Sequence, residues 1–546
     1  QKSGTTLPRL LSGLLVQGYD NHGQLKTNID IQVVRSLLQV TFLLYKLELP
    51  FKKAAVKQKL DCFLKAESDL RLLNLNADDD VLQYARALIV KVFDGFNPKD
   101  ITPGHGPGAV ATGEKDEGKW VIKRKYANLH AYYPYYEYFI PSRSSICHNN
   151  YGLGEHGSQK RPGPFLEQYR RLVNLDEASS TIRLVPKDSR GPRIISMEPL
   201  ELQFAQQGLK NELYRHIEGN PLTKGFVNFT KQNINGELAR QGSEDGSWAT
   251  LDMKEASDRV SLQLVRILFH GTELLKALEA VRSQMSTYEP DEFSEGFTVR
   301  LMKYAPMGSA VCFPVEAMVF WALSKAIIAS EKGELNRPSI DPVYVYGDDI
   351  IVETKYSSAL KSNLPKYGLL VNNEKSYDAG PFRESCGSDC FKGKLVTPIK
   401  IKELWPCTEN ASTSIQSYAE YSNSFYESGY YASASYLAQT PLLRELTRLP
   451  RKFRSGTAIR RDDSPRLKTK MKRSSFTRLT LVTCLTHKTR VTRLRGNERL
   501  FANVTGHMTS QYVVPYATTC KLRWIDLRDT QIPKWAEKLT ERCCHF

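Results

Sequence analysis

Apolar residues recur at helical spacing through most of the first 100 residues. The run DDDVLQYARALIVKVFDGF (78–96) starts with acidic residues and then repeats apolar ones every three to four positions, which predicts a helix. The earlier run VVRSLLQVTFLLYKLEL (33–49) is interrupted by polar residues at the same spacing and predicts a buried amphipathic helix. We therefore expect a largely helical N-terminal region.

The pattern changes after residue 180, where strand-like runs alternate with helical ones. A strand from residue 181 is expected to turn at DSRGP (188–192) and to return through RIIS. WATLDM (248–253) predicts a second strand, followed by a helix in ASDRVSLQLVRILF (256–269). After MGSAVCFP, the run VEAMVFWALSKAII (315–328) predicts a further helix. This alternation indicates an α/β arrangement around a central sheet.

The stretch VYVYGDDIIVE (343–353) places two adjacent carboxylates, Asp348 and Asp349, between apolar β-like runs. Alternating and β-branched residues on both sides of the Gly-Asp pair predict a strand, a tight turn and a second strand. Because Gly and Asp are favoured turn residues, an ordinary hairpin turn explains this window as well as a functional site does.

The composition fits a globular protein with a sizeable core and a basic surface. Of the 546 residues, 41% are hydrophobic and 25% charged, and the formal net charge is +17. Between residues 451 and 500 there are 16 Lys plus Arg and only 3 Asp plus Glu. Such an excess favours a surface that binds nucleic-acid phosphates over a merely solvated face, with Arg460, Lys472 and Arg473 as candidate contacts.

The sequence contains neither an apolar run near the ~20 residues that span a bilayer nor a signal-peptide pattern at its start. We therefore expect no membrane association. The first residues, QKSGTTLPRL, lack an initiator Met, which suggests a fragment or a processed form.

The ten cysteines include no CxxC pair. Cys386 and Cys390 are four residues apart, and Cys543, Cys544 and His545 crowd the C-terminus, so a zinc site is a minor alternative without a complete four-ligand pattern. Scattered thiols in a large protein suit a reducing cytoplasm.

Two stretches of unusual composition, one rich in glycine and one rich in tyrosine, each allow a structural and a functional interpretation. The Gly-rich stretch TPGHGPGAVATGEKDEGKW (102–120) predicts a loop, and it matches neither a Walker A motif nor a dinucleotide fingerprint. The aromatic cluster HAYYPYYEYF (130–139) favours a tyrosine-rich packing layer over a platform on which bases stack.

A further carboxylate, Asp252 in TLDMKEASDRVS, ends an apolar strand 96 residues before Asp348. Two strands that each end in a carboxylate can lie side by side in one sheet, with their acids clustered at one edge. Such a cluster repels itself unless a cation neutralises it, and hard oxygen ligands suit Mg²⁺ or Mn²⁺. Two such ions would activate an attacking hydroxyl and stabilise a leaving phosphate oxygen.

Three further groups of residues fit the same chemistry, although each also has an ordinary explanation. Lys187, Arg190 and Arg193 could present cations to a polyphosphate or be surface charges on a hairpin. Gly308 and Ser309 precede a helix and could hold a nucleic-acid backbone or sugar, or simply cap the helix. Lys375 could donate a proton to a departing pyrophosphate or be a lone surface lysine.

Taken in order, these stretches resemble the palm motifs of viral RNA-dependent RNA polymerases. LDMKEASD resembles motif A, MGSAVCFPVEAMVF motif B, YGDD motif C, and LVPKDSRGPRIISMEP the basic motif F. GPFRESCGSDCFKG (380–393) is similar to the segment after the palm in replicase β-subunits of levivirus-type RNA bacteriophages, the family of the Q-beta replicase; HGPGAV and EPLELQFAQQG also resemble that family. The similarity covers roughly residues 104–400.

The resemblance implies an α/β (α+β) protein, a right-handed fingers-palm-thumb polymerase with an antiparallel-sheet palm. Its expected divisions are an N-terminal helical region packing on fingers and thumb (1–100), fingers (101–247), the motif A part of the palm (248–262), a fingers insertion (263–300), the remaining palm with motifs B to E (301–400), and a thumb with the basic C-terminal region (401–546).

The resemblance also assigns roles. Asp252, Asp348 and Asp349 match the metal-binding acids, with Asp348 the stronger candidate for direct ligation, and Asp258 matches the acid near the ribose of the incoming nucleotide. Ser309 stands where the family often has Asn, and Cys312 where relatives often have Thr. The resemblance further implies Lys187, Arg190 and Arg193 along the nucleotide channel, Lys375 as proton donor, and RNA contacts at Gly308 and Arg383.

The expected reaction is RNA-templated RNA synthesis, with attack of a 3′-hydroxyl on the α-phosphate of an NTP, release of pyrophosphate, and two Mg²⁺ or Mn²⁺ ions as cofactors. Expected partners are RNA template and product, NTPs and, by resemblance only, host translation elongation factors Tu and Ts and a ribosomal protein, in the cytoplasm of an infected bacterial cell. Two alternatives remain, a reverse transcriptase and a non-enzymatic RNA-binding subunit with a polymerase-like relic.

Overall fold

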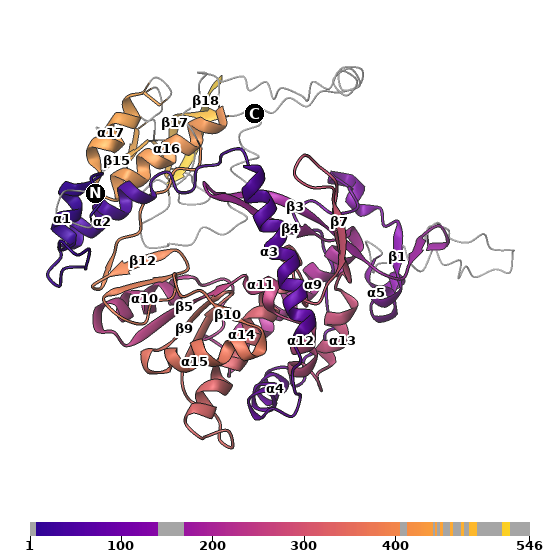
Figure 1. Ribbon diagram of the computed structural model, residues 1–546. Coiled ribbons are helices and arrows are strands. Elements are labelled where there is room, and N and C mark those ends of the chain that lie inside the picture. Colours follow the sequence, from indigo (N-terminus) through magenta and orange to yellow (C-terminus); the bar gives the residue numbers. More distant parts are fainter. Residues whose placement is uncertain are drawn as a thin grey trace. The chain divides into compact units, whose positions relative to one another are not determined.

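The computed structural model describes residues 7–139, 169–403, 412–440, 443–444, 448–450, 459–461, 471–473, 480–488 and 516–524 (Figure 1). The chain forms two compact units. The first comprises Gln1–Val40 and Leu49–Pro398, and the second comprises Thr41–Glu48 and Ile399–Phe546. The finer division into fingers, palm and thumb stays a prediction.

Residues 7–100 contain four helices, as their periodicity predicts: α1 (Ser12–Gly18), α2 (Ile31–Phe42), α3 (Lys53–Leu72) and α4 (Asp80–Val92). Helix α4 begins after Asp79, whose side chain caps it by accepting from the Leu82 N–H. Helix α2 ends at Phe42, earlier than the apolar run to residue 49 predicts, because the chain turns at residues 43–46.

A four-stranded antiparallel sheet lies at the centre of the first unit. Its strands are β5 (Trp248–Lys254), β8 (Val343–Tyr346), β9 (Asp349–Glu353) and β10 (Leu370–Val371), in the order β10-β5-β9-β8. Helix α14 (Cys312–Glu331) packs on β8 and α4, and α10 (Asn233–Asp245) packs on β5 (Figure 1). Antiparallel pairing throughout this sheet, combined with its covering helices, confirms the predicted α+β class.

A second four-stranded sheet contains the predicted basic hairpin. Strands β3 (Ser179–Asp188) and β4 (Gly191–Met197) pair antiparallel, and β6 (Met285–Tyr288) and β7 (Phe297–Arg300) complete the order β4-β3-β6-β7. Helix α3 packs on β4 through a small apolar core that includes Val56, Leu60 and Phe63. The N-terminal helical region thereby supports the hairpin that bears Lys187.

The remaining elements complete the two units. In the first they are η1 (Asp116–Trp120), β1 (Arg124–Tyr126), α5 (Ala127–Tyr132), α6 (Tyr135–Tyr138), β2 (Val173–Leu175), α9 (Leu200–Gly219), α11 (Ala256–Arg259), α12 (Leu262–Leu268), α13 (Glu273–Ala280), η2 (Thr354–Tyr356), α15 (Ser357–Asn363), η3 (Leu364–Tyr367), β11 (Phe382–Ser385), β12 (Ser388–Phe391) and β13 (Lys394–Leu395). In the second they are α16 (Ser412–Glu427), α17 (Tyr431–Gln439), β14 (Arg448–Pro450), β15 (Ile459–Arg461), β16 (Met471–Arg473), β17 (Thr480–Lys488) and β18 (Tyr516–Trp524).

Two segments of the second unit that are far apart in sequence are joined by backbone hydrogen bonds. The Ile401 N–H donates to the Leu43 carbonyl at 2.8 Å, and the Glu48 N–H donates to the Lys402 carbonyl at 2.8 Å. Helices α16 and α17 pack together over an apolar cluster that includes Tyr418 and Ala438. The second unit is therefore discontinuous in sequence.

The aromatic cluster is a packing layer, which confirms the blander of its two interpretations. Tyr133, Tyr135, Tyr138 and Phe139 are all buried in the main core. The Tyr133 hydroxyl donates to the Pro98 carbonyl at 2.8 Å, so even its polar end is satisfied inside the protein. These rings are therefore not available for stacking on bases.

Helix α14 is the one helix among the described residues that is long and apolar enough, by length and composition alone, to cross a membrane. The sequence pattern did not indicate such a run, because Glu316 and Lys325 interrupt it. In the structure 94% of its apolar window is buried inside the protein, as expected of a core helix.

Candidate functional site

The sheet brings the predicted acids together. Strands β5 and β9 pair antiparallel in a register that sets Asp252 directly opposite Asp349. Because cross-strand partners share one face of a sheet, the two carboxylates are neighbours. Asp348 follows Gly347 in the two-residue turn between β8 and β9, and its carbonyl accepts from the Met253 N–H at 3.2 Å. The predicted side-by-side arrangement of the two strands is thus confirmed.

The turn before the acids requires glycine for two reasons. Gly347 has φ +60°, in the left-handed region that other residues rarely adopt. A Cβ added there would lie 2.1 Å from Cε2 of Phe313, on α14. The turn is therefore pressed onto the helix, which fixes where Asp348 stands.

The two adjacent acids differ in their surroundings. Asp348 is exposed, whereas Asp349 is half-buried and its Oδ2 accepts from the Cys386 N–H at 2.9 Å. Burial, with added repulsion from Asp348 and Glu384, raises the pKa of Asp349 to about 7. Asp348 is thus the more accessible of the two carboxylates, and Asp349 is hydrogen-bonded to the turn of the β11–β12 hairpin.

Asp252 lies between polar partners on its own side of the sheet. Burial raises its pKa, while Lys375 and a hydrogen bond from Asn372 oppose that rise. The Asn372 amide donates to Asp252 Oδ2 at 2.7 Å, and Lys375 Nζ lies 4.0 Å from the same oxygen. The structure therefore brings Lys375 to the acids as expected.

Sequence reasoning missed two residues of this site. Asn372 orients Asp252, but nothing in the sequence distinguishes it from the neighbouring Asn373. Glu384 acts on the pKa of Asp349 from β11, and its own pKa is raised by burial and by Asp389. Glu384 lies within GPFRESCG, the stretch that resembles the phage replicases, and this position could have marked it as a candidate site residue.

Of the three cations predicted on the basic hairpin, Lys187 and Arg193 lie near each other, whereas Arg190 is paired within the turn. Desolvation lowers the pKa of Lys187, and Arg193 and Lys375 lower it further, so these cations lie near Lys187. Lys187 and Lys375 in turn lower the pKa of Asp252, which places both near that acid. Arg190 lies in the β3–β4 turn, where its guanidinium donates to Asp188 at 3.0 and 3.2 Å. The carboxylate of Asp188 thus offsets part of the charge expected of Arg190.

The loop before α14 packs closely on the basic hairpin. Gly308 has φ +125°, and a Cβ there would lie 2.1 Å from the Ser196 carbonyl oxygen of β4. The Ser196 N–H donates to the Met307 carbonyl at 2.8 Å. Ser309 is buried, and its hydroxyl has no hydrogen-bond partner among the described residues. An unsatisfied buried hydroxyl is expected where a ligand completes the hydrogen bonding.

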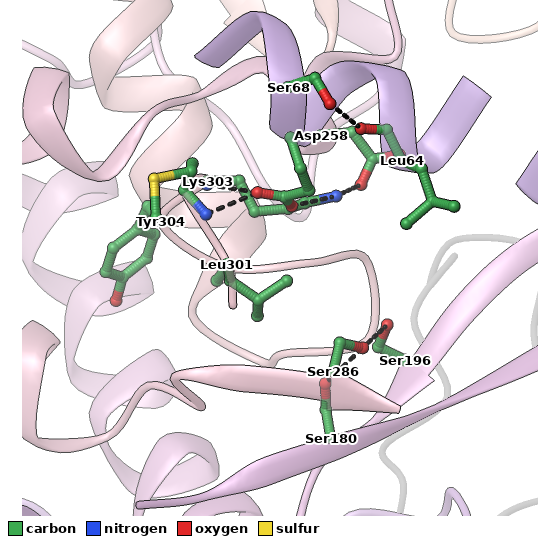
Figure 2. Close-up of polar contacts among 12 residues, drawn as sticks. Leu64, Ser68, Ser180, Ser196, Asp258, Ser286, Leu301, Lys303 and Tyr304 are labelled. Carbon is green, nitrogen blue, oxygen red and sulfur yellow. Dashed lines mark hydrogen bonds and ion pairs between the residues drawn. The ribbon is translucent and has the colours of Figure 1, made fainter. Parts of the chain in front are cut away.

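Asp258 lies on α11, one turn beyond β5, and remains partly exposed. Its Oδ1 accepts from Lys303 Nζ at 2.6 Å, an ion pair shown in Figure 2. The acid expected near the sugar is therefore held by a cation of the protein.

Arg383 contradicts its predicted RNA contact. Its side chain is 1% exposed, and its guanidinium donates to four backbone carbonyls, including those of Trp248 at 2.6 Å and Gly380 at 2.8 Å. It therefore ties β11 to the start of β5, and Nε and Nη1 are engaged by the backbone.

The cations predicted in the C-terminal region are only partly described. Arg460 is mostly buried and pairs with Glu420 at 2.9 Å and Glu427 at 3.6 Å, which argues against a free phosphate contact. Lys472 and Arg473 lie on β16, but their side chains lie outside the described residues, as does most of the basic run 451–500.

The three acids suit a hard divalent cation by their chemistry. Asp252 and Asp349 lie opposite each other on paired strands, and the charge of Asp348 raises the pKa of both, so a cation would relieve their mutual repulsion. In the described ranges, however, no group of three or more His, Cys, Asp or Glu converges closely enough to hold a metal. The described residues therefore give no support to the alternative of a zinc site. Cys386 and Cys390 are free thiols, and Cys543, Cys544 and His545 lie outside the described residues.

The sequence model of the family described as "RNA replicase, beta-chain" matches residues 61–413. The RNA-directed RNA polymerase beta chain of Enterobacteria phage fr is 33% identical over 219 residues, which are 40% of this chain and 37% of that protein. The corresponding beta subunit of Enterobacteria phage SP is 33% identical over 256 residues, 45% of this chain and 42% of that one. The RNA-directed RNA polymerase subunit beta of Escherichia virus Qbeta is 32% identical over 220 residues, which are 40% of this chain and 34% of that protein.

These matches span less than half the length of the curated relatives. Among solved structures, the BmCPV RNA-dependent RNA polymerase at elongation state has a TM-score of 0.37 at 12% identity, covering 64% of this chain and 32% of that one. Truncated apo telomerase from Candida tropicalis has a TM-score of 0.29 at 16% identity, covering 40% and 54%.

Proposed function

The chain belongs to the RNA replicase β-chain family, and we propose that it is an RNA-dependent RNA polymerase that copies the single-stranded RNA genome of a phage. The observation that supports this most directly is the register of β5 and β9. It sets Asp252 opposite Asp349, with Asp348 exposed in the adjoining turn and Lys375 and Lys187 close by. A carboxylate pair faced by cations suits transfer of a nucleotide from a triphosphate.

In the proposed reaction, the 3′-hydroxyl of the growing strand, or of a first nucleotide, attacks the α-phosphate of an NTP, and pyrophosphate leaves. Asp252 and Asp348 would hold two Mg²⁺ or Mn²⁺ ions, with Asp349 supporting them from behind. When bound, such ions supply positive charge for the attacking and leaving oxygens. Holding reactants in line in this way accounts for much of catalysis in phosphoryl transfer.

The cations of the site have separate tasks in this proposal. Lys187 and Arg193 bind the triphosphate, with Arg190 at the edge of the same hairpin. Lys375, 4.0 Å from Asp252, donates a proton to the departing pyrophosphate. Asp258 and the unsatisfied Ser309 hydroxyl receive the ribose, beside the Gly308 backbone.

The proposed macromolecular partners are the RNA template and product, held in part by the basic region 451–500. By resemblance alone we add host elongation factors Tu and Ts and a ribosomal protein, with the infected bacterial cytoplasm as the place of action. We propose no membrane partner.

The test is template-dependent RNA synthesis by the purified full chain, with and without a bacterial extract. Asp252→Asn and Asp348→Asn should each abolish incorporation while leaving RNA binding largely intact. Glu353→Gln, at the far end of β9, serves as the matched control and should stay active. Near-normal elongation by either aspartate variant would refute the assignment of the acids, and preferential use of dNTPs would indicate a reverse transcriptase instead.

A further inference from the structure

A fully buried lysine lies next to the acid that is proposed to receive the ribose. Lys303 has a side-chain exposure of 0%, and its Nζ lies 2.6 Å from Asp258 Oδ1 (Figure 2). The same Nζ lies 3.1 Å from a second carboxylate oxygen, Glu67 Oε1. Its ammonium also lies 3.6 Å from the centre of the Phe63 ring. A buried ammonium needs such partners, because it has three donors and no access to water.

Backbone contacts fix the loop that bears Lys303. Glu67 Oε2 accepts from the Met302 N–H at 2.5 Å and from the Lys303 N–H at 3.4 Å. The Tyr304 N–H donates to Val260 at 2.8 Å, and the Leu262 N–H donates to Met302 at 2.8 Å, so the loop is bonded to the chain just after α11. Lys303 therefore has little freedom to move away from Asp258.

The contact determines how Asp258 can be used. Lys303 takes Oδ1, which leaves Oδ2 on a partly exposed carboxylate as the acceptor for a hydroxyl group. An ion pair to one oxygen also prevents the carboxylate from rotating, and a fixed acceptor discriminates better between a sugar with and without that hydroxyl.

We propose that Lys303, braced by Glu67 of α3, is a positioning residue that fixes Asp258 for a hydroxyl of the incoming ribonucleotide. Lys303 acts through Asp258 and does not touch the substrate. The N-terminal helix α3 thereby influences sugar selectivity at Asp258 of α11, which follows strand β5 of the central sheet. This inference rests on the proposed polymerase function.

Lys303 is not needed merely to hold α3 against α11. Arg259 of α11, the residue after Asp258, already pairs at 3.0 Å with Asp69 of α3, two residues after Glu67. That ion pair joins the same two helices without touching Asp258. It supplies a control that separates a tie between helices from positioning of the acid.

The test variant is Lys303→Met combined with Glu67→Gln. The pair removes the ammonium without leaving a buried carboxylate unpaired, and the glutamine carbonyl can still accept from the Met302 N–H. The control variant is Asp69→Asn. For each full-length protein, kcat/KM is measured for CTP and dCTP on one RNA template.

We expect the CTP/dCTP preference of the double variant to fall by at least about tenfold, mainly through a higher KM for CTP, since a lost hydrogen bond to a charged group has that order of effect. Asp69→Asn should keep the preference of the unchanged chain. Adding Asp258→Asn to the double variant should lower the preference no further, because the residues act as one unit.

An unchanged CTP/dCTP preference in a folded double variant would overturn the positioning role of Lys303, but not the proposed polymerase function. Absence of RNA synthesis by the unchanged chain would instead overturn the proposed function, and this inference with it. If the double variant does not fold, the single variant Glu67→Gln replaces it as the test. It keeps the charge on Lys303 and should lower the preference several-fold, while no change would again overturn the role.

Discussion

Replacing Gly347 by alanine should displace the turn that presents Asp348. Two costs add at this position. Alanine at φ +60° costs about 1 kcal/mol relative to glycine. The added methyl also lies 2.1 Å from the Phe313 ring, and overpacking of this kind costs about 1–3 kcal/mol.

Phe313 has little room to relieve the overlap. Its ring centre lies 5.8 Å from that of Phe229 and 5.5 Å from that of Tyr346, both in edge-on contacts. We therefore expect the turn to shift as well as the ring. A loss of about 2–4 kcal/mol in the free energy of unfolding should result, and a displacement near 1 Å would lower nucleotide incorporation about 100-fold.

Gly246→Ala is the matched control. Gly246 also has a positive φ, of +75°, but a Cβ there meets nothing within 4 Å. It should lose only about 1 kcal/mol and keep its activity. Urea unfolding and a primer-extension assay on both variants measure the two effects. Equal stability and activity of the two variants would refute the reasoning that contact with Phe313 fixes the turn.

Three further predictions concern other parts of the chain. Burial beside Asp348 raises the pKa of Asp349 to about 7 from its ordinary 3.8, so the folded protein keeps a proton that the unfolded chain has released. The free energy of unfolding without divalent ions should therefore fall as pH rises from about 4 to 7, and Asp349→Asn should make that fall smaller in urea titrations. Arg383→Met should lower stability by about 2–4 kcal/mol because four carbonyls lose their donor, while RNA affinity of the folded variant stays unchanged in filter binding; weaker RNA binding would restore the predicted contact. Neutralising several cations between Arg451 and Arg499 should lower RNA affinity and flatten its dependence on salt by about 0.7 per lost contact, and an unchanged slope would show that this region binds no phosphate.

Local patterns in the sequence predicted the elements of the central site correctly. Strands β8 and β9, their glycine turn and the strand that ends near Asp252 each follow from alternation and turn residues within a dozen positions. The side-by-side placement of β5 and β9 was predicted because each strand ends or begins at a carboxylate, and carboxylates clustered at one sheet edge can share a cation.

Long-range burial could not be predicted in the same way. Arg383 donates to the carbonyl of Trp248, 135 residues earlier, and Lys303 pairs with Glu67, 236 residues earlier. In the sequence both look like ordinary exposed cations. Only the fold shows that each has exchanged water for fixed oxygen partners.

The discontinuous second unit has a consequence for the order in which the chain can fold during synthesis. Leu43 emerges from the ribosome some 350 residues before its partner Ile401. Closing a loop of that length costs about 5 kcal/mol of chain entropy, a cost that falls once the intervening residues have already become compact. Residues 43–48 should therefore lack their bonds to residues 401 and 402 while the first unit forms. A ribosome stalled before residue 399 should then yield a nascent chain whose 43–48 segment is more sensitive to protease than in the finished protein.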